Sequence, residues 1–261
     1  MAEAVAAVGR PAGASNAVLW LRVAILGVTF AVWEAVAASG LLYRDVVPSL
    51  VRIGEALFKL LASPAFYFNL SATAGEVAGA VVIGSAAGLA VGVILGSSRF
   101  LSRAFEPFVY YLGPSPKIIF FPVMIMWFGV GPASKVALGA VSCFFPMALS
   151  TAAGMRQIDR VLIRVGRSFR ASTWQMVSKI YLPAMRIPVL NGFRLGMGLA
   201  IIGVLLSETK LSNRGIGFMI NHAYSLFDMP SMYSLLILVF LVARAINAGL
   251  GRFGRVPGTA G

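Results

Sequence analysis

The chain has 261 residues, of which 59% are hydrophobic and only 12% are charged, and its mean hydropathy is +0.86. A soluble domain of this size cannot bury so much apolar surface, so the composition predicts that lipid surrounds most of the chain. The net charge of +13 does not indicate a nucleic-acid-binding protein, because the basic residues lie between long apolar runs, as the positive-inside rule predicts for membrane proteins.

Six apolar segments are predicted to cross the bilayer as helices, at 19–40, 69–97, 106–128, 134–154, 188–208 and 232–251. Together they form a predicted transmembrane domain (19–251, core 69–251), preceded by a flexible segment (1–18) and followed by a short tail (252–261). Residues 19–38 also resemble a signal peptide, but the long apolar run and the later spans favour an uncleaved first span.

The distribution of basic residues predicts the orientation. With the N-terminus inside, 16 of the 22 Lys and Arg residues fall on the cytoplasmic side or at the helix ends there. Both termini and the loop 155–187 are therefore predicted to be cytoplasmic. On the outer side, residues 48–63 repeat apolar residues at helical spacing, which predicts an interfacial helix.

Two spans carry unusual residues. In the second span, glycines recur every four residues from Gly84 to Gly96, which predicts a close helix approach within a bundle or between two copies. The third span contains Pro114, Pro116 and Pro122. Such prolines indicate either a broken helix beside a substrate path or a kinked helix that only packs.

The loop 155–187 is the most informative segment, with seven basic residues and a single acid, Asp159. Asp159 is a predicted N-cap of a first amphipathic helix, and Ser172 with Gln175 predicts the capping box of a second, which ends at Pro183. Two short helices with a corner between them would form a rigid knob outside the membrane. The alternative is a helix pair that lies on anionic lipid headgroups.

No motif indicates an enzyme. The sequence has no P-loop, its one histidine (His222) is predicted to lie in an outer loop, and its one cysteine (Cys143) lies in an apolar span. Glu34, Glu76 and Glu208 are predicted to be interfacial or bundle-facing acids, since none has a partner at midspan as a proton relay requires. We therefore expect no catalytic, cofactor or metal site on this chain.

At the knob, the chain resembles the inner-membrane permease subunits of binding-protein-dependent ABC importers. Their signature is a cytoplasmic E-A-A-x-x-x-G-A followed by an apolar residue, an isoleucine and leucine-proline. The residues in register are Ala171, Val177, Ile180, Leu182 and Pro183. Permeases of this kind often read A-A-R-S-L-G-A-S there, and Ser168, Ala171 and Ser172 match that variant. The sequence departs from the signature at Arg170, which stands at the glycine, and at Arg164, Val165 and Gly166, which stand at E-A-A.

Further matches resemble the nitrate, taurine and aliphatic-sulfonate branch of these permeases. The third span and its exit match P-x-P and then P-x-x-x-x-W-F-G-x-G-x-x-S-K, ending at Ser134 and Lys135. Phe144, Phe145 and Pro146 match the F-F-P of that branch, and Gly192, Arg194, Leu195, Gly203 and Glu208 match its fifth span. At Glu76 the branch commonly has arginine.

The resemblance implies an all-α permease in the bacterial inner membrane, as a homodimer or as a heterodimer with a second permease. Two separate ATPase subunits, which carry ATP and Mg, would dock on the knobs, with Ala171 at the corner and Trp174 and Val177 as anchors. A soluble binding protein would deliver a small oxyanion such as a sulfonate, taurine or nitrate. The residues implied for the translocation path are Pro114, Pro116, Pro122, Ser207 and Glu208.

Other functions are compatible with the sequence. The same family serves vitamin precursors and other small solutes. An ion-coupled carrier or channel would transport without ATP and would need charged pairs at midspan. A membrane scaffold that transports nothing is the third alternative.

Overall fold

The computed structural model describes residues 12–40 and 46–253. Every regular element in these residues is a helix, which confirms the all-α prediction. Most of the predicted flexible segment (1–18) and tail (252–261) lies outside the described residues, although the first helix already begins at Ala12.

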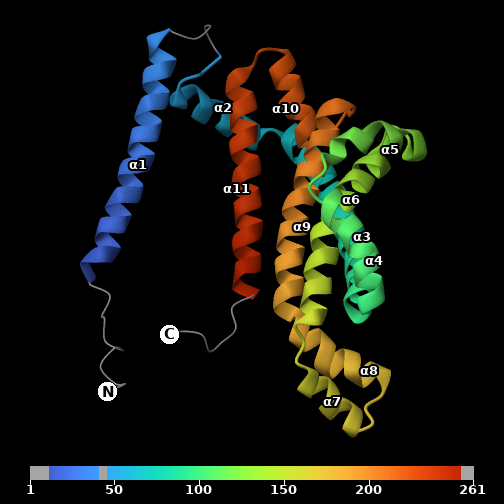
Figure 1. Ribbon diagram of the computed structural model, residues 1–261. Coiled ribbons are helices and arrows are strands. Elements are labelled where there is room, and N and C mark those ends of the chain that lie inside the picture. Colours follow the sequence, from blue (N-terminus) through green and yellow to red (C-terminus); the bar gives the residue numbers. More distant parts are fainter. Residues whose placement is uncertain (1–11, 41–45, 254–261) are drawn as a thin grey trace.

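The elements follow one another with short connections (Figure 1). In order they are α1 (Ala12–Ser39), α2 (Leu50–Ala62), α3 (Pro64–Ser97), α4 (Arg99–Leu112), the 3₁₀-helix η1 (Lys117–Phe120), α5 (Phe121–Phe128), α6 (Pro132–Arg156), α7 (Arg160–Ser168), α8 (Thr173–Met176), the π-helix η2 (Val177–Tyr181), α9 (Leu182–Lys210), α10 (Ile216–Ser225) and α11 (Met229–Phe253). Within residues 12–40 and 46–253, five helices are long and apolar enough to cross a membrane, or six if α4 and η1–α5 count as one bent span.

The core of the bundle consists of α3, α6 and α9, which pack against one another along their lengths. The glycine ridge of α3 lies against α6 of the same chain: a Cβ on Gly88 would stand 2.7 Å from Cβ of Met147, and one on Gly92 would stand 2.6 Å from the carbonyl oxygen of Ala148. Missing side chains therefore let the two backbones approach, and of the two predicted alternatives the structure shows the one within the bundle. Cys143 lies fully buried in this core.

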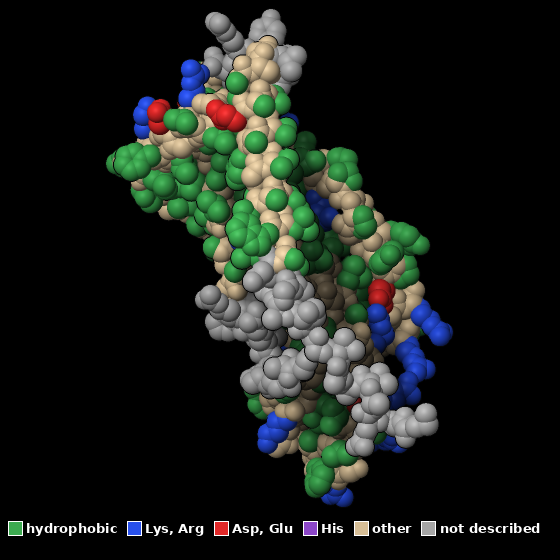
Figure 2. All heavy atoms as spheres, turned by 90° about the vertical axis from the view of Figure 1, so that its left-hand side faces the viewer, with side chains coloured by type: hydrophobic (Ala, Val, Ile, Leu, Met, Phe, Trp, Pro, Cys, Tyr) green, Lys and Arg blue, Asp and Glu red, His purple; other side chains and the backbone are tan. Residues whose placement is uncertain are grey.

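The bundle has two ends that differ in content (Figure 1). The knob end carries α7 and α8, together with the start of α1 and the end of α11; the α10 end carries α2, α10 and the connection from α5 to α6. Between them, hydrophobic side chains cover much of the face seen in Figure 2, and most of the Lys and Arg side chains visible there lie toward the ends. With 34 residues at about 1.5 Å each, α3 is about 51 Å long and exceeds a hydrocarbon core of about 30 Å.

Helix α1 is exposed along most of its length and contacts the other helices near its C-terminal end. There the indole of Trp33 donates to the carbonyl oxygen of Pro48 and packs edge-on against Tyr233. The backbone N–H of Leu50, at the start of α2, donates to Glu34 at 3.0 Å. The predicted interfacial helix is α2, and Glu34 satisfies one of its free N-terminal amides.

Two predicted segments differ from the structure. The third span does not start at 106, because Ser98 caps a helix that begins at Arg99, and it is not continuous, because the chain bends by 92° between α4 and η1–α5. The second knob helix does not stop at Pro183. A wide π-turn at η2 precedes the proline, which then falls in the first turn of α9, where its missing N–H is tolerated.

Candidate functional site

The first candidate site is the knob, which we define as Asp159–Tyr181. The predicted caps are confirmed: Asp159 accepts from the N–H of Val161 at 2.8 Å, and Ser172 and Gln175 form a complete capping box. The two helices pack together at Gly166, where an added Cβ would stand 2.5 Å from Cδ1 of Ile180. The knob is therefore a folded unit with fixed helix ends.

The backbone conformation at the corner of the knob explains why the sequence signature has glycine at the position of Arg170. Arg170 has φ = +51°, in the left-handed region, and the next N–H, of Ala171, donates to the carbonyl oxygen of Gly166. This geometry ends the first helix and starts the turn. Glycine adopts it without a steric penalty, whereas a side chain in this region is strained.

The knob exposes apolar side chains. Phe169 is 82% exposed and Trp174 is 74% exposed, and Val161, Leu162 and Val165 are exposed on the first helix. Ser168, Arg170 and Ser172 are exposed too, Ala171, Val177 and Ile180 are partly buried, and Leu182 and Pro183 lie exposed just beyond the knob. Large exposed apolar side chains next to arginines are typical of a surface that binds another protein.

The base of the knob is tied to the broken helix by an ion pair that the sequence analysis did not predict. The guanidinium of Arg156, at the end of α6, donates to both carboxylate oxygens of Glu106 on α4 at 2.5 and 2.8 Å, and Ser102 joins the pair. A bidentate pair fixes direction as well as distance. The helix that enters the knob and the first half of the broken span are thus connected.

The break in the third span is held by Lys117. Its ammonium donates to the carbonyl oxygens of Gly113 and Ser115, which the bent chain frees, and it lies 5.1 Å from the ring centre of Phe145. Pro114, Pro116 and Pro122 are all exposed along this segment. The structure therefore shows a broken rather than a merely kinked helix.

At the α10 end, side chains from α3 and α9 satisfy the first turn of α10. Glu208 accepts from the hydroxyl of Thr73 and from the N–H of Gly217, both at 2.7 Å, and the same hydroxyl accepts from the N–H of Ile216. A carboxylate at a helix N-terminus is favourable because it meets free amides and the positive end of the dipole. His222 lies in this helix and not in the predicted outer loop.

A buried ion pair lies beside this arrangement. Lys135, 2% exposed in the first turn of α6, pairs with Glu76 at 3.3 Å and donates to Ser212 at 2.7 Å. The carboxyl group of Glu76 also lies close enough to Glu208 for their charges to interact, and its Oε2 has no hydrogen-bond partner among the described residues. This partner of Glu76 was not predicted, and the pair lies at the end of α6 and not at midspan, where a proton relay would need it. We call Thr73, Glu76, Lys135, Glu208 and Ser212 the polar cluster.

Ser207 and Glu208, implied as path residues, are both buried in the bundle of one chain, 0% and 1% exposed. Ser207 donates to the carbonyl oxygen of Val204 within its own helix. For Glu76 and Glu208, the structure shows the bundle-facing environment that the sequence predicted.

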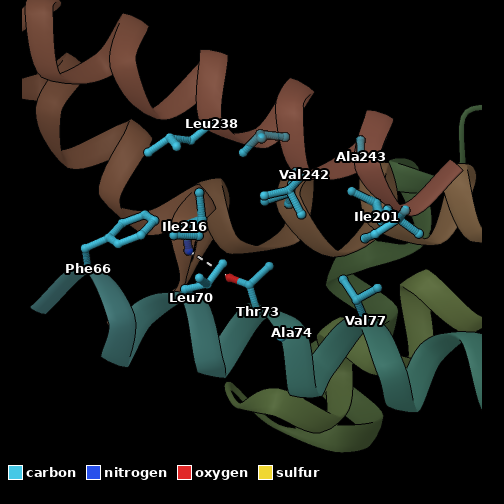
Figure 3. A pocket seen from close by; sticks show the side chains of 13 residues that line it. Phe66, Leu70, Thr73, Ala74, Val77, Ile201, Ile216, Leu238, Val242 and Ala243 are labelled. Carbon is cyan, nitrogen blue, oxygen red and sulfur yellow. Dashed lines mark hydrogen bonds between the residues drawn. The ribbon is translucent and has the colours of Figure 1, made fainter. Parts of the chain in front are cut away.

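Two cavities differ in chemistry. The first, of about 110 Å³, lies between α3, α9, the start of α10 and α11, and its lining is almost entirely apolar, with Thr73 directed toward the N–H of Ile216 (Figure 3). The second, of about 600 Å³, lies at the α10 end between the α5–α6 and α9–α10 connections and includes Lys135 and Arg214. A charged solute is excluded from the first by desolvation, whereas the second offers polar contacts.

Comparisons with known proteins agree with this architecture. Residues 80–253 match the family model of the binding-protein-dependent transport system inner membrane component, which is well over half of the chain. The chain belongs to this family. A chain of the MetNI methionine ABC transporter, in an inward-facing form, has the same fold with a TM-score of 0.65; it is 20% identical, and the match covers 77% of this chain and 97% of that one.

Several permeases are similar along most of their length. The putative aliphatic sulfonates transport permease of Bacillus subtilis is 28% identical over 88% of this chain and 83% of its own length. The taurine permease of Escherichia coli is 26% identical over 88% of this chain and 86% of its own length, and the nitrate import permease of Synechococcus elongatus is 24% identical over 84% and 82%. The chain is thus a membrane-spanning transport component of the ABC importer type.

Proposed function

We propose that this permease moves a small oxyanion, such as a sulfonate, taurine or nitrate, across the bacterial plasma membrane. A soluble binding protein delivers the solute at the α10 end, and two copies of a separate ATPase subunit dock on the knobs of a permease dimer. ATP and Mg belong to those subunits, and this chain contributes no catalytic group. The names of its relatives support the solute class.

The proposal rests on the structure of the knob. Its helix ends are fixed by caps, yet Phe169 and Trp174 point away from the chain and bury little surface within it. A folded protrusion with unburied aromatic side chains is expected to seat in a groove of a partner. Closure of the ATPases would then move the knob, and the Arg156–Glu106 pair would pass this movement to α4 and the bend.

Loss of docking tests the proposal. Ala171→Asp would place a charge at the contact, and Trp174→Ala would remove an anchor, with a loss of about 2 kcal/mol or more in ATPase binding. Each change should abolish ATPase co-purification and ATP-driven uptake of taurine in reconstituted vesicles. Phe58→Ala removes an equally exposed aromatic side chain from α2, at the other end, and should leave ATPase co-purification unchanged. Normal co-purification of both knob variants would refute the docking role.

Orientation is tested separately. We propose that the knob end is cytoplasmic, because most basic residues lie there by the positive-inside rule. A cysteine at Ser172 should resist a membrane-impermeant maleimide in intact cells and react after lysis. Labelling in intact cells would show that the knob faces the outside of the cell.

A further inference from the structure

The cavity at the α10 end, which we call the basic cavity, has a lining suited to an anion. Its lining residues are Phe68, Val130, Gly131, Pro132, Lys135, Leu211, Ser212, Asn213 and Arg214, and none of them is acidic. At about 600 Å³ it is within the size range of small-molecule sites. It opens at the end of the bundle where the binding protein is proposed to release its solute.

The two cations of this cavity are held differently. Lys135 is buried, and the polar cluster fixes its ammonium between Glu76 and Ser212. Arg214 is partly exposed, and its guanidinium forms no ion pair with any carboxylate of the described residues. One cation is therefore built into the wall, and the other is free to meet a ligand with a planar fork of donors.

The backbone adds a third favourable feature. Helix α6 begins at this cavity with Gly131 as its N-cap and Pro132 as its first residue, and no side chain in the described part of the chain caps its first turn. The free amides and the positive end of the helix dipole at such a terminus favour an anion. By itself a helix end is not a site, but here it opens into a cavity that two cations already line.

We propose that the basic cavity is an acceptor site for the anionic head group of the transported solute, with Arg214 as its main contact and Lys135 as its fixed wall. Because Glu76 pairs with Lys135 from behind, Arg214 is the lining cation that has no carboxylate partner among the described residues. The solute class rests on the proposed function, whereas anion binding follows from the cavity alone.

Direct binding to the permease tests the site without any ATPase. The full chain is placed in neutral phosphatidylcholine nanodiscs, and ethanesulfonate binding is followed by saturation-transfer difference NMR. We expect saturable binding that nitrate displaces and that choline leaves unchanged. Arg214→Gln should weaken it about tenfold, because a hydrogen-bonded charge is lost, and Arg214→Lys should weaken it less.

A matched control separates a site from general surface charge. Lys210→Gln removes the same charge from an exposed residue four positions away that does not line the cavity, and it should leave binding unchanged. Asn213→Asp adds a negative charge at an exposed lining residue, where folding is not at risk, and should weaken binding as strongly as Arg214→Gln. If Arg214→Gln fails to assemble, Asn213→Asp alone tests whether the basic cavity binds the anion.

Three results would overturn the inference: no saturable binding to the wild type, equal weakening by Arg214→Gln and Lys210→Gln, or full binding by Asn213→Asp. None of these results bears on knob docking, so the proposed function would stand. If instead the permease binds ethanesulfonate but shows no ATP-driven uptake with its ATPases, the acceptor site stands and the proposed function fails.

Discussion

The two ends of the bundle invert the usual placement of side chains. At the α10 end, the charged residues of the polar cluster are buried and joined by hydrogen bonds across α3, α6 and α9. At the knob, Phe169 and Trp174 are exposed although they are apolar. The polar cluster is therefore satisfied within one chain, whereas the exposed aromatic side chains of the knob are the ones that the proposed ATPase subunit would cover.

The largest loss of stability is expected when one member of the buried ion pair is removed. Lys135→Met should leave Glu76 charged and unpaired in the bundle, which destabilises the chain by about 3–5 kcal/mol. The double variant Glu76→Leu with Lys135→Met should recover most of this loss, because no charge is stranded. Thermal unfolding in detergent measures both, and a double variant no more stable than the single one would show that the pair does not act as a unit.

The glycine ridge should give the next largest effect. A Cβ on Gly88 would stand 2.7 Å from Cβ of Met147 and 2.8 Å from the carbonyl oxygen of Phe144, so Gly88→Ala must push α3 and α6 apart. We expect a loss of about 1–3 kcal/mol, and a larger one for leucine. Gly75→Ala, in the same helix with nothing within 4 Å, is the control and should be neutral or stabilising. Equal melting temperatures for the two alanine variants would contradict this packing.

A smaller effect, of opposite sign, is expected at the corner of the knob. Arg170→Gly removes the strain of a side chain in the left-handed region and should stabilise the corner by about 1 kcal/mol. Slower hydrogen exchange at the N–H of Ala171 would report this. In contrast, Arg167→Gly lies within α7 and should speed exchange in that helix. Faster exchange in both variants would mean that the corner is not strained.

The smallest effect on stability is expected at the exposed aromatic residue of the knob. Trp174→Ala should change the free energy of unfolding by no more than about 0.5 kcal/mol, although docking is lost. Met176, two residues away, is buried between the knob helices, and Met176→Ala should loosen the knob by about 2 kcal/mol. If Trp174→Ala destabilises the chain as much as Met176→Ala does, Trp174 belongs to the knob interior and is not an exposed docking residue.

Features that depend on neighbours in sequence were predicted well. The caps at Asp159 and Ser172 follow from residues two or three positions apart, and the apolar runs identify the membrane helices by length. The glycine repeat predicted close packing but not its partner. Sequence spacing carries this local information because it is set by the helix itself.

Features that depend on distant parts of the chain were missed. Glu76 and Lys135 are 59 positions apart, and in the sequence each is an isolated charged residue near the end of a predicted span. Helix α10 was assigned to a loop because its start depends on Glu208 and Thr73, which belong to other helices. The continuation through Pro183 was missed since a π-turn has no clear signature in the sequence. Tertiary contacts decide the first two of these features.

The burial of Cys143 has a practical consequence for every accessibility experiment on this protein. Its thiol has no exposed surface, lies 3.4 Å from the hydroxyl of Ser85, and faces Gly196, where even a Cβ would be 2.8 Å from the sulfur. Maleimides and spin labels cannot reach it without unfolding the core. Thiol reagents should therefore not react with the folded natural chain. A single introduced cysteine can be labelled selectively without replacing Cys143.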